Sequence, residues 1–345
     1  MAIGEYVMKA LIVGSDGQDG YYLSKYLLGI GYEVYGVVRK KTVGHQDTDL
    51  NSAQKYHQIY ADLTDFSSLI NAVGEACPDE IYNLAGQSEI PLSWRQPSLT
   101  AEVNALGVIR LLETIRLVNP SIRFFQASSS EMFGGSSSQA LNEKSLFQPR
   151  NPYGTSKVFA HWCVDNYRTK YGLFACCGIL FNHESPRRGQ EFVTRKISMA
   201  AAKIHLGKQD YLSLGNLGAI RDWGHAADYV RGMHLLLQQD APQDYVIATG
   251  IPHSVRDFAA AAFRAVGREI VWQNCGLDEA GFDARTGEQL VCVDPALFRF
   301  PAEDCIMGDS SKIRRELNFH CQYTFEQLVR EMVERDVALL MQTVE

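Results

Sequence analysis

The chain has 345 residues, of which 46% are hydrophobic and 21% are charged. A chain of this length buries a sizeable core, in one large domain or in two coupled domains. The formal net charge of −7 argues against nucleic acid as the main partner. The sequence shows no signal-peptide pattern and no apolar run of about 18 residues, so we expect a cytoplasmic protein without a membrane partner.

The eight cysteines show neither a Cys-x-x-Cys pair nor the spacing of metal ligands. We expect all of them to be reduced and we expect no metal site.

Strand and helix patterns alternate over the first 180 residues. Apolar runs predict strands at 9–13, 34–38, 80–85, 123–127 and 174–180. Helical spacing of apolar residues predicts helices at 66–76, 96–118 and 153–171. Buried strands that alternate with helices predict an α/β fold with a doubly wound parallel sheet of the Rossmann type.

The regularity fades after residue 180, where loops separate two further strand candidates at 245–248 and 290–293. We therefore expect a smaller mixed α/β domain, interleaved with the first on its C-terminal side. The dinucleotide-binding domain is assigned to 1–180, about 220–249 and about 289–308, and the substrate domain to about 181–219, 250–288 and 309–345.

A glycine-rich loop follows the first strand. Gly14, Gly17 and Gly20 are spaced Gly-x-x-Gly-x-x-Gly between a strand and a helix. Such glycines permit a tight turn, let a pyrophosphate approach the backbone and bring the helix close to the sheet. The loop predicts a dinucleotide site formed by Gly14, Ser15, Asp16, Gly17, Gln18 and Asp19.

Three cations follow the second strand at Arg39, Lys40 and Lys41, where an acidic residue would bind the ribose of NAD. Cations at this position favour the 2′-phosphate of NADP. Asp16, in the phosphate loop, favours NAD instead because it repels extra anionic charge. A solvated basic turn is the alternative interpretation of the three cations.

Two later strand ends have the character of a cofactor site. Asp62 and Leu63 follow one strand region, and the Asp62 carboxylate can accept a hydrogen bond from an adenine amine. The next strand ends in Asn83-Leu84-Ala85-Gly86, where small residues would let a cofactor pass close to the backbone. Ordinary strand endings are the alternative interpretation of both segments.

A tyrosine and a lysine, Tyr153 and Lys157, lie one helical turn apart and point from the same face. We expect the ammonium to lower the pKa of the phenol, so that the phenolate can take a proton from a sugar hydroxyl. Upstream, Ser128–Ser130 ends a strand at the sheet edge where such folds bind ligands, and a hydroxyl there can hydrogen-bond the same alcohol.

Glu131 adds a base that a simple alcohol oxidation does not need. Once carbon 4 of a hexose is a ketone, the proton on carbon 5 becomes acidic. A carboxylate can remove that proton and help to expel the carbon 6 hydroxyl as water. The alternative is a solvated loop glutamate.

Longer motifs in the chain include Gln126–Glu131, Asn151–Gly154, Leu180–Gly189, Phe192–Lys196 and Arg221–His225. With these motifs, nearly the whole chain resembles the GDP-mannose 4,6-dehydratase family of extended short-chain dehydrogenases/reductases. The string Asn-His-Glu-Ser-Pro-Arg-Arg-Gly at 182–189 is the most specific of them.

The resemblance implies catalytic roles for Ser129, Glu131, Tyr153 and Lys157. It implies cofactor contacts from the loop 14–19 and from Arg39, Lys40, Asp62, Leu63, Leu84, Ala85, Gly86, Ser88, Lys157, His183 and Arg188. The implied substrate contacts are Ser88, Ser129, Asn182, Val193, Lys196, Arg221 and Arg299.

The chain departs from the family pattern in several places. Ser129 stands where threonine is usual, Asp16 where the family commonly has threonine, and Leu99 where a tyrosine is expected. The segment after Arg39 is shorter than in the family and lacks the basic loop that can reach a neighbour's cofactor site, which argues against a tetramer and for a dimer. In the segment that begins at Arg299, the proline and glutamate are displaced by one position.

These observations predict a nucleotide-sugar 4,6-dehydratase that acts on GDP-mannose, uses NADP rather than NAD, and forms a homo-oligomer. The alternatives are a related dehydratase, decarboxylase or epimerase for another nucleotide sugar, such as a GDP-heptose, and a non-catalytic NADPH-binding sensor.

Overall fold

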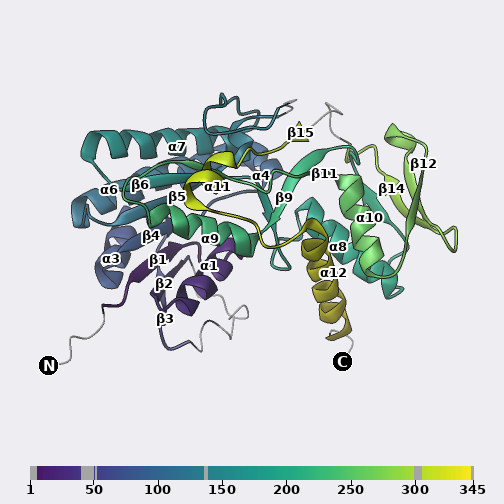
Figure 1. The fold of residues 1–345 in the computed structure, drawn as a ribbon, viewed down its shortest axis with the longest axis horizontal. Helices are drawn as coiled ribbons and strands as arrows, with labels where there is room; N and C mark the ends of the chain where they lie inside the picture. Colours follow the sequence, from purple (N-terminus) through teal and green to yellow (C-terminus); the bar gives the residue numbers. More distant parts are fainter. Residues whose placement is uncertain (1–5, 40–49, 51–52, 136–138, 299–304, 343–345) are drawn as a thin grey trace.

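The computed structural model describes residues 6–39, 50, 53–135, 139–298 and 305–342. In this part of the chain, the largest element is a seven-stranded sheet with the order β10-β6-β5-β4-β1-β2-β3 (Figure 1). All of its neighbouring strands are parallel. Its strands are β1 (Lys9–Val13), β2 (Glu33–Val38), β3 (Tyr56–Tyr60), β4 (Glu80–Asn83), β5 (Arg123–Ser129), β6 (Ala175–Leu180) and β10 (Tyr245–Ile247).

Helices cover both faces of this sheet, as the doubly wound pattern predicts. One face packs against α3 (Phe66–Ala76), α6 (Gly107–Val118) and α7 (Pro152–Tyr171). The other packs against α1 (Gln18–Gly29) and α9 (Ala226–Leu237). Because β1 and β6 are buried on both sides, their sequences are nearly continuous apolar runs. The strands β4 and β5 are buried as well but include polar residues, among them Glu80, Asn83 and Gln126.

The helix α7, which carries two predicted catalytic residues, has clear signals at both ends. Asn151 is its N-cap, and the side chain accepts a hydrogen bond from the Gly154 N–H. Pro152 occupies the first helical position, where its missing N–H costs nothing. Gly172 ends the helix in the left-handed conformation, with φ of 67°.

The single helix predicted over 96–118 is three consecutive elements. They are α5 (Pro97–Ala101), a π-helical turn η1 (Glu102–Leu106) and α6, preceded by a short α4 (Ile90–Arg95). The π-helical turn places Asn104 toward the backbone of Gln87, whose N–H and C=O both bond the Asn104 amide. Tertiary hydrogen bonds thus override a helical pattern that is regular in the sequence.

A second unit lies beside the carboxyl edge of the large sheet, to the right in Figure 1. It has its own core, formed by α8 (Val193–His205), α10 (Val255–Ala265), α12 (Phe325–Gln342) and a four-stranded sheet. That sheet has the order β12-β13-β14-β8. Its strands are β8 (Leu212–Leu214), β12 (Ile270–Gln273), β13 (Ala280–Asp283) and β14 (Gln289–Val293). Two short 3-10 helices lie in loops: η2 (Ser130–Met132) follows β5, and η3 (Gly276–Asp278) precedes β13.

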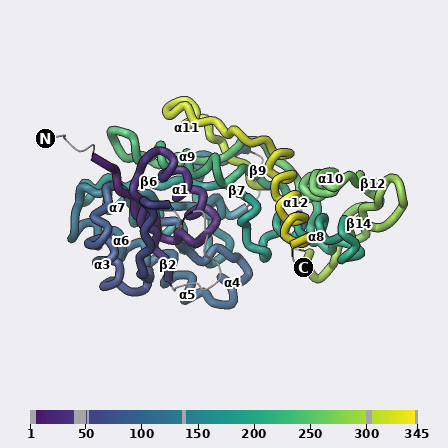
Figure 2. The backbone as a smooth tube through the Cα atoms, turned by 90° about the horizontal axis from the view of Figure 1, so that it is seen from below, coloured from purple at the N-terminus to yellow at the C-terminus, as the bar shows by residue number. Residues whose placement is uncertain are grey.

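A third, small sheet joins the two units (Figure 2). Its centre is β9 (Ile220–His225), which pairs with β7 (Asn182–Glu184), β11 (Pro252–Ser254) and β15 (Cys305–Ile306). No helix in the described residues is long and apolar enough to cross a membrane.

Three segments differ from the predicted division of the chain. β14, which we assigned to the dinucleotide-binding domain, pairs with β13 and β8 in the second unit. β9, assigned to the same domain, lies in the joining sheet. In contrast, α11 (Ser311–Leu317), assigned to the substrate domain, packs its Ile313 into the core of the large sheet. The unit to which each segment belongs depends on contacts with residues far away in the sequence. Local sequence patterns give no information about such contacts.

Candidate active site

The predicted site residues gather at the carboxyl edge of the large sheet. Parallel strands all end at this edge, so the loops after β1, β4, β5 and β6 come together there. These loops contain the glycine-rich segment, Leu84–Ser88, Ser129–Glu131 and the segment that begins at Asn182.

The glycine-rich loop turns sharply against the end of β4. Gly14 has φ of +90°, and a Cβ there would lie 2.8 Å from the Ala85 nitrogen. A Cβ on Gly20 would lie 2.2 Å from the Gly14 oxygen. Both glycines are therefore required by close packing. Gly17 is exposed and provides no side-chain cap to α1. The start of a helix without such a cap suits an anion.

An ion pair braces the start of α1 against β7. The Nε2 of His183 is 2.8 Å from the Asp19 carboxylate, and its Nδ1 is 2.7 Å from the Phe181 carbonyl. Both partners are acceptors, so both ring nitrogens must donate, and the imidazole is protonated. Burial favours the neutral ring, but Asp19 and the Phe181 carbonyl outweigh it and raise the pKa of His183.

The same contacts determine the charge of Asp19. Burial acts to raise its pKa, but His183, Gln18 and Arg188 outweigh burial and lower it. Gln18 adds a second link, because its side chain donates to the His183 carbonyl and accepts from the Ser185 hydroxyl. Since both ring N–H groups of His183 are engaged with protein, we infer that His183 supports a cofactor through the phosphate loop.

Arg188 lies near this ion pair. Its Nε is 3.0 Å from the Glu184 carboxylate, and its guanidinium lies 3.5 Å over the Phe192 ring. Arg188 also helps to lower the pKa of Asp19. A contact of Arg188 with a cofactor stays a prediction.

The other predicted cofactor residues follow β2, β3 and β4. Arg39 is exposed at the end of β2, while Lys40 lies outside the described residues. The Asp62 carboxylate accepts from the N–H and hydroxyl of Thr64, and Leu63 is buried. Burial acts to raise the pKa of Asp62, but the Thr64 bonds, with Arg39, lower it. Along the loop after β4, the exposed positions are Gly86 and Ser88, and the half-buried ones are Leu84 and Ala85.

Tyr153 and Lys157 are both buried on one face of α7. The Lys157 Nζ donates to the Ala127 carbonyl at 2.9 Å and lies 5.8 Å from the centre of the Tyr153 ring. Burial lowers the pKa of Lys157 to about 8. The pKa of Tyr153 is raised to about 12, chiefly by burial, while a hydrogen bond from Ser129 acts in the opposite direction. The lowered phenol pKa that we predicted is therefore wrong for this state of the site, because burial dominates.

Glu131 lies in η2 (Ser130–Met132), directly after β5. The Ser129 hydroxyl accepts from the Glu131 N–H at 3.2 Å, which places the two predicted catalytic side chains on one turn. The Glu131 Oε2 accepts from the Asn151 amide at 2.9 Å. The sequence motif containing Asn151 gave no role to this residue, although its position before Pro-Tyr was visible.

Asn104 is a second residue that the sequence did not single out. It is buried, and its amide bonds the backbone of Gln87 and the Ser156 hydroxyl. Its Oδ1 would lie 3.0 Å from a Cβ on Gly86. Asn104 thus fixes the loop after β4 against α7, and its only signal was a polar residue within an apolar helical pattern.

The predicted substrate residues lie on the joining sheet and the second unit. Asn182 is on β7, in register with Trp223 of β9, and Arg221 is on the same β9, where it donates to the Ile220 carbonyl. Val193 begins α8 and is exposed, as is Lys196 one turn later. Arg299 lies outside the described residues.

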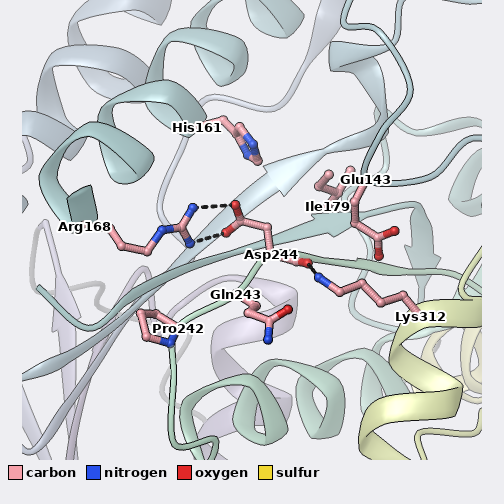
Figure 3. A pocket seen from close by; sticks show the side chains of 8 residues that line it. All are labelled: Glu143, His161, Arg168, Ile179, Pro242, Gln243, Asp244 and Lys312. Carbon is pink, nitrogen blue, oxygen red and sulfur yellow. Dashed lines mark hydrogen bonds and ion pairs between the residues drawn. The ribbon is translucent and has the colours of Figure 1, made fainter. Parts of the chain in front are cut away.

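A separate polar hollow of about 350 Å³ lies along β10, at the edge of the large sheet (Figure 3). Its charged residues bond one another or the edge strand. Arg168 binds Asp244, Lys312 donates to the Asp244 carbonyl at 2.8 Å, and Glu143 accepts from the Val246 N–H at 2.7 Å. We interpret this hollow as protection of an edge strand.

Comparisons with known proteins agree with this geometry. The family model for GDP-mannose 4,6 dehydratase matches residues 11–332. A GDP-mannose 4,6-dehydratase of Sinorhizobium fredii is 46% identical over 343 residues, which are 97% of this chain and 98% of that protein.

Solved structures show the same fold. A dTDP-glucose 4,6-dehydratase of Bacillus anthracis in complex with NAD has a TM-score of 0.79 at 18% identity, covering 95% of this chain and 96% of that one. RMD of Pseudomonas aeruginosa complexed with NADPH has a TM-score of 0.78 at 21% identity, covering 96% and 100%. Because the family model and the relative both span almost the whole chain, the protein belongs to the GDP-mannose 4,6-dehydratase family.

Proposed function

We propose that this protein converts GDP-mannose to GDP-4-keto-6-deoxymannose, as a lyase that eliminates water. The observation that carries the proposal is the grouping of a buried tyrosine–lysine pair with a carboxylate at one sheet edge. Tyr153 and Lys157 suit alcohol oxidation, while Glu131 suits a proton abstraction that oxidation alone does not require.

The residues present fit a nicotinamide dinucleotide. The exposed Gly17 and the uncapped start of α1 suit a pyrophosphate, and the loop after β4 leaves Gly86 open beside Lys157. Such a cofactor, when bound, accepts a hydride from carbon 4 and later returns one to carbon 6. We further propose that the cofactor is NADP, because Arg39 is exposed at the end of β2, where a 2′-phosphate would lie.

Tyr153 removes the proton of the carbon 4 hydroxyl in its phenolate form, which is the minor form in this state of the site because burial raises its pKa to about 12. The Ser129 hydroxyl orients the sugar hydroxyl. The Ser129 hydrogen bond acts to lower the pKa of Tyr153 against the effect of burial. Lys157 is held by the Ala127 carbonyl beside the ring, with its pKa near 8, so the ammonium is the main form at neutral pH. Its positive charge stabilises negative charge that develops on the site.

Glu131 acts on the ketone that follows. Its carboxylate takes the carbon 5 proton, the carbon 6–oxygen bond breaks, and the proton leaves with the hydroxyl as water. A double bond forms between carbons 5 and 6. Addition of hydride at carbon 6 and of a proton at carbon 5 completes the 6-deoxy sugar.

We also propose a homo-oligomer and a cytoplasmic location. An apolar groove of about 730 Å³ runs between α4, η1 and the start of α7, with Trp94, Leu106 and Phe159 exposed at it. A second copy of the chain would cover these side chains. All eight cysteines are free thiols, as suits a reducing compartment.

Mass spectrometry of GDP-mannose incubated with the purified protein, without added reductant, tests the function. We expect a product that has lost one water and carries a ketone. In Glu131→Gln we expect cofactor reduction without water loss. Unchanged GDP-mannose beside folded, cofactor-loaded protein would contradict the substrate, and normal water loss in Glu131→Gln would contradict the role of that carboxylate.

A further inference from the structure

One side chain connects the catalytic carboxylate to the catalytic helix. The Asn151 Oδ1 accepts from the Gly154 N–H at 2.7 Å, which caps the first turn of α7. The Nδ2 of the same amide donates to the Glu131 Oε2 at 2.9 Å. Tyr153, two residues after Asn151, lies in that first turn.

The backbone around this amide is closely packed. A Cβ on Gly154 would lie 2.5 Å from the Glu131 carbonyl oxygen, so α7 and η2 are in direct contact. The Glu131 N–H is held by the Ser129 hydroxyl. The backbone of Glu131 is therefore fixed on two sides, and the contact that holds its carboxylate comes from Asn151.

We propose that Asn151 is a positioning residue for the elimination step, an inference that rests on the proposed function. It holds Oε2 and so aims Oε1 at the carbon 5 proton. An asparagine has both the acceptor that caps a helix and the donor that a carboxylate needs. Serine and aspartate, which cap helices equally well, have no such amide donor.

This chemistry separates the two tasks of Asn151. Asn151→Ser keeps an oxygen at the N-cap but is too short to reach Glu131. Asn151→Asp keeps the cap and places a second carboxylate beside Glu131. Both variants should retain α7, and Tyr153 with it, while they release the Glu131 side chain. Ser254→Ala, which removes the N-cap of α10 in the second unit, is the matched control for loss of a cap alone.

The test is single-turnover kinetics of cofactor-loaded enzyme with GDP-mannose. Absorbance at the reduced-nicotinamide band follows oxidation of carbon 4, and quenched-flow mass spectrometry follows loss of water. In Asn151→Ser we expect oxidation at close to the wild-type rate and elimination slower by about 10- to 100-fold, so that reduced cofactor accumulates. Asn151→Asp should show the same separation of the two steps, and Ser254→Ala should show none.

Equal slowing of both steps in Asn151→Ser and Asn151→Asp would overturn the inference, because it would show that the residue only caps α7. Unchanged elimination in both variants would overturn it as well. Wild-type enzyme that never dehydrates GDP-mannose is a different result, since it refutes the proposed function itself and this inference with it.

Discussion

Gly154 lies at the contact between the start of α7 and the turn that carries Glu131. Its missing side chain allows this contact, because a Cβ would lie 2.5 Å from the Glu131 carbonyl oxygen and 3.2 Å from the Pro149 Cβ. Backbone atoms cannot move aside as a flexible side chain can. We expect Gly154→Ala to destabilise the protein by about 1–3 kcal/mol and to reduce dehydration strongly, because Glu131 and Tyr153 are forced apart.

Gly74 provides the matched control for that substitution. It lies within α3, and a Cβ there would meet nothing within 4 Å. Gly74→Ala should stabilise the helix by up to about 1 kcal/mol and leave the activity unchanged. Urea unfolding measures the stability of both variants, and the rate of product formation measures their activity. Equal stability of the two variants would show that the close contact at Gly154 relaxes freely.

The buried Lys157 makes the stability depend on pH. Its pKa is lowered by burial to about 8, so above that pH the folded protein has released a proton that the unfolded chain keeps until about pH 10.4. Stability therefore rises with pH from about 8 to 10, by on the order of 2 kcal/mol. Above about pH 10 the effect reverses, because the unfolded chain ionises tyrosines while burial keeps Tyr153 protonated.

Lys157→Met tests this prediction. The free energy of unfolding should rise between pH 8 and pH 10 more steeply in the wild type than in the variant, and the variant should be the more stable protein below pH 8. Parallel curves for the two proteins would show that Lys157 titrates at its ordinary pKa.

At the scale of elements, the sequence predicted the secondary structure of a segment correctly where local contacts determine it. It failed where residues far along the chain determine the conformation. The helix at 66–76 was predicted with its bounds from the helical spacing of its apolar residues, and in the structure the Asp65 side chain caps its start. The π-helical turn at Glu102–Leu106 was not, since the backbone of Gln87 determines it. For the same reason Asn104 and Asn151 were missed, while Tyr153 and Glu131 were found from their chemistry.

The contact between α1 and β7 depends on the protonated His183. Its pKa is raised by Asp19, so the ion pair stabilises the folded state fully below about pH 6.5 and is lost as pH rises through the folded-state value. We expect His183→Gln to lose about 1.5–3 kcal/mol of stability at pH 6. The difference from wild type should shrink at higher pH.

The control is His57→Gln, because His57 pairs with Glu33 on the partly exposed surface of β3 and contributes little. The measurement is the free energy of unfolding of the wild type, His183→Gln and His57→Gln at pH 6, 7.5 and 9. A constant difference between His183→Gln and wild type over this range would contradict the pairing of a charged His183 with Asp19.

At the scale of the whole molecule, the two units are joined through β9, and a buried carboxylate fixes this junction. Asp222 accepts hydrogen bonds from the adjacent residues Thr249 and Gly250, which follow β10, and from Gly308, which follows β15. The sequence predicted two interleaved domains, but it assigned β14 and α11 to the opposite units. β14 takes its position by pairing with β8 and β13, and α11 by packing against the core of the large sheet beside β10. No local pattern encodes such partners.

The exposed face of α7 leads to the last prediction, which concerns assembly. Trp94, Leu106 and Phe159 are 63%, 40% and 45% exposed around one apolar groove. Burial of a large apolar side chain at an interface contributes about 2 kcal/mol, and a second copy would bury each of them twice through two-fold symmetry.

We expect Phe159→Glu to convert an oligomer into monomers in sedimentation equilibrium. Val271→Glu, at a half-exposed position of β12 in the second unit, should leave the assembly intact. A wild-type protein that sediments as a monomer, or a Phe159→Glu variant that stays assembled, would place the interface elsewhere.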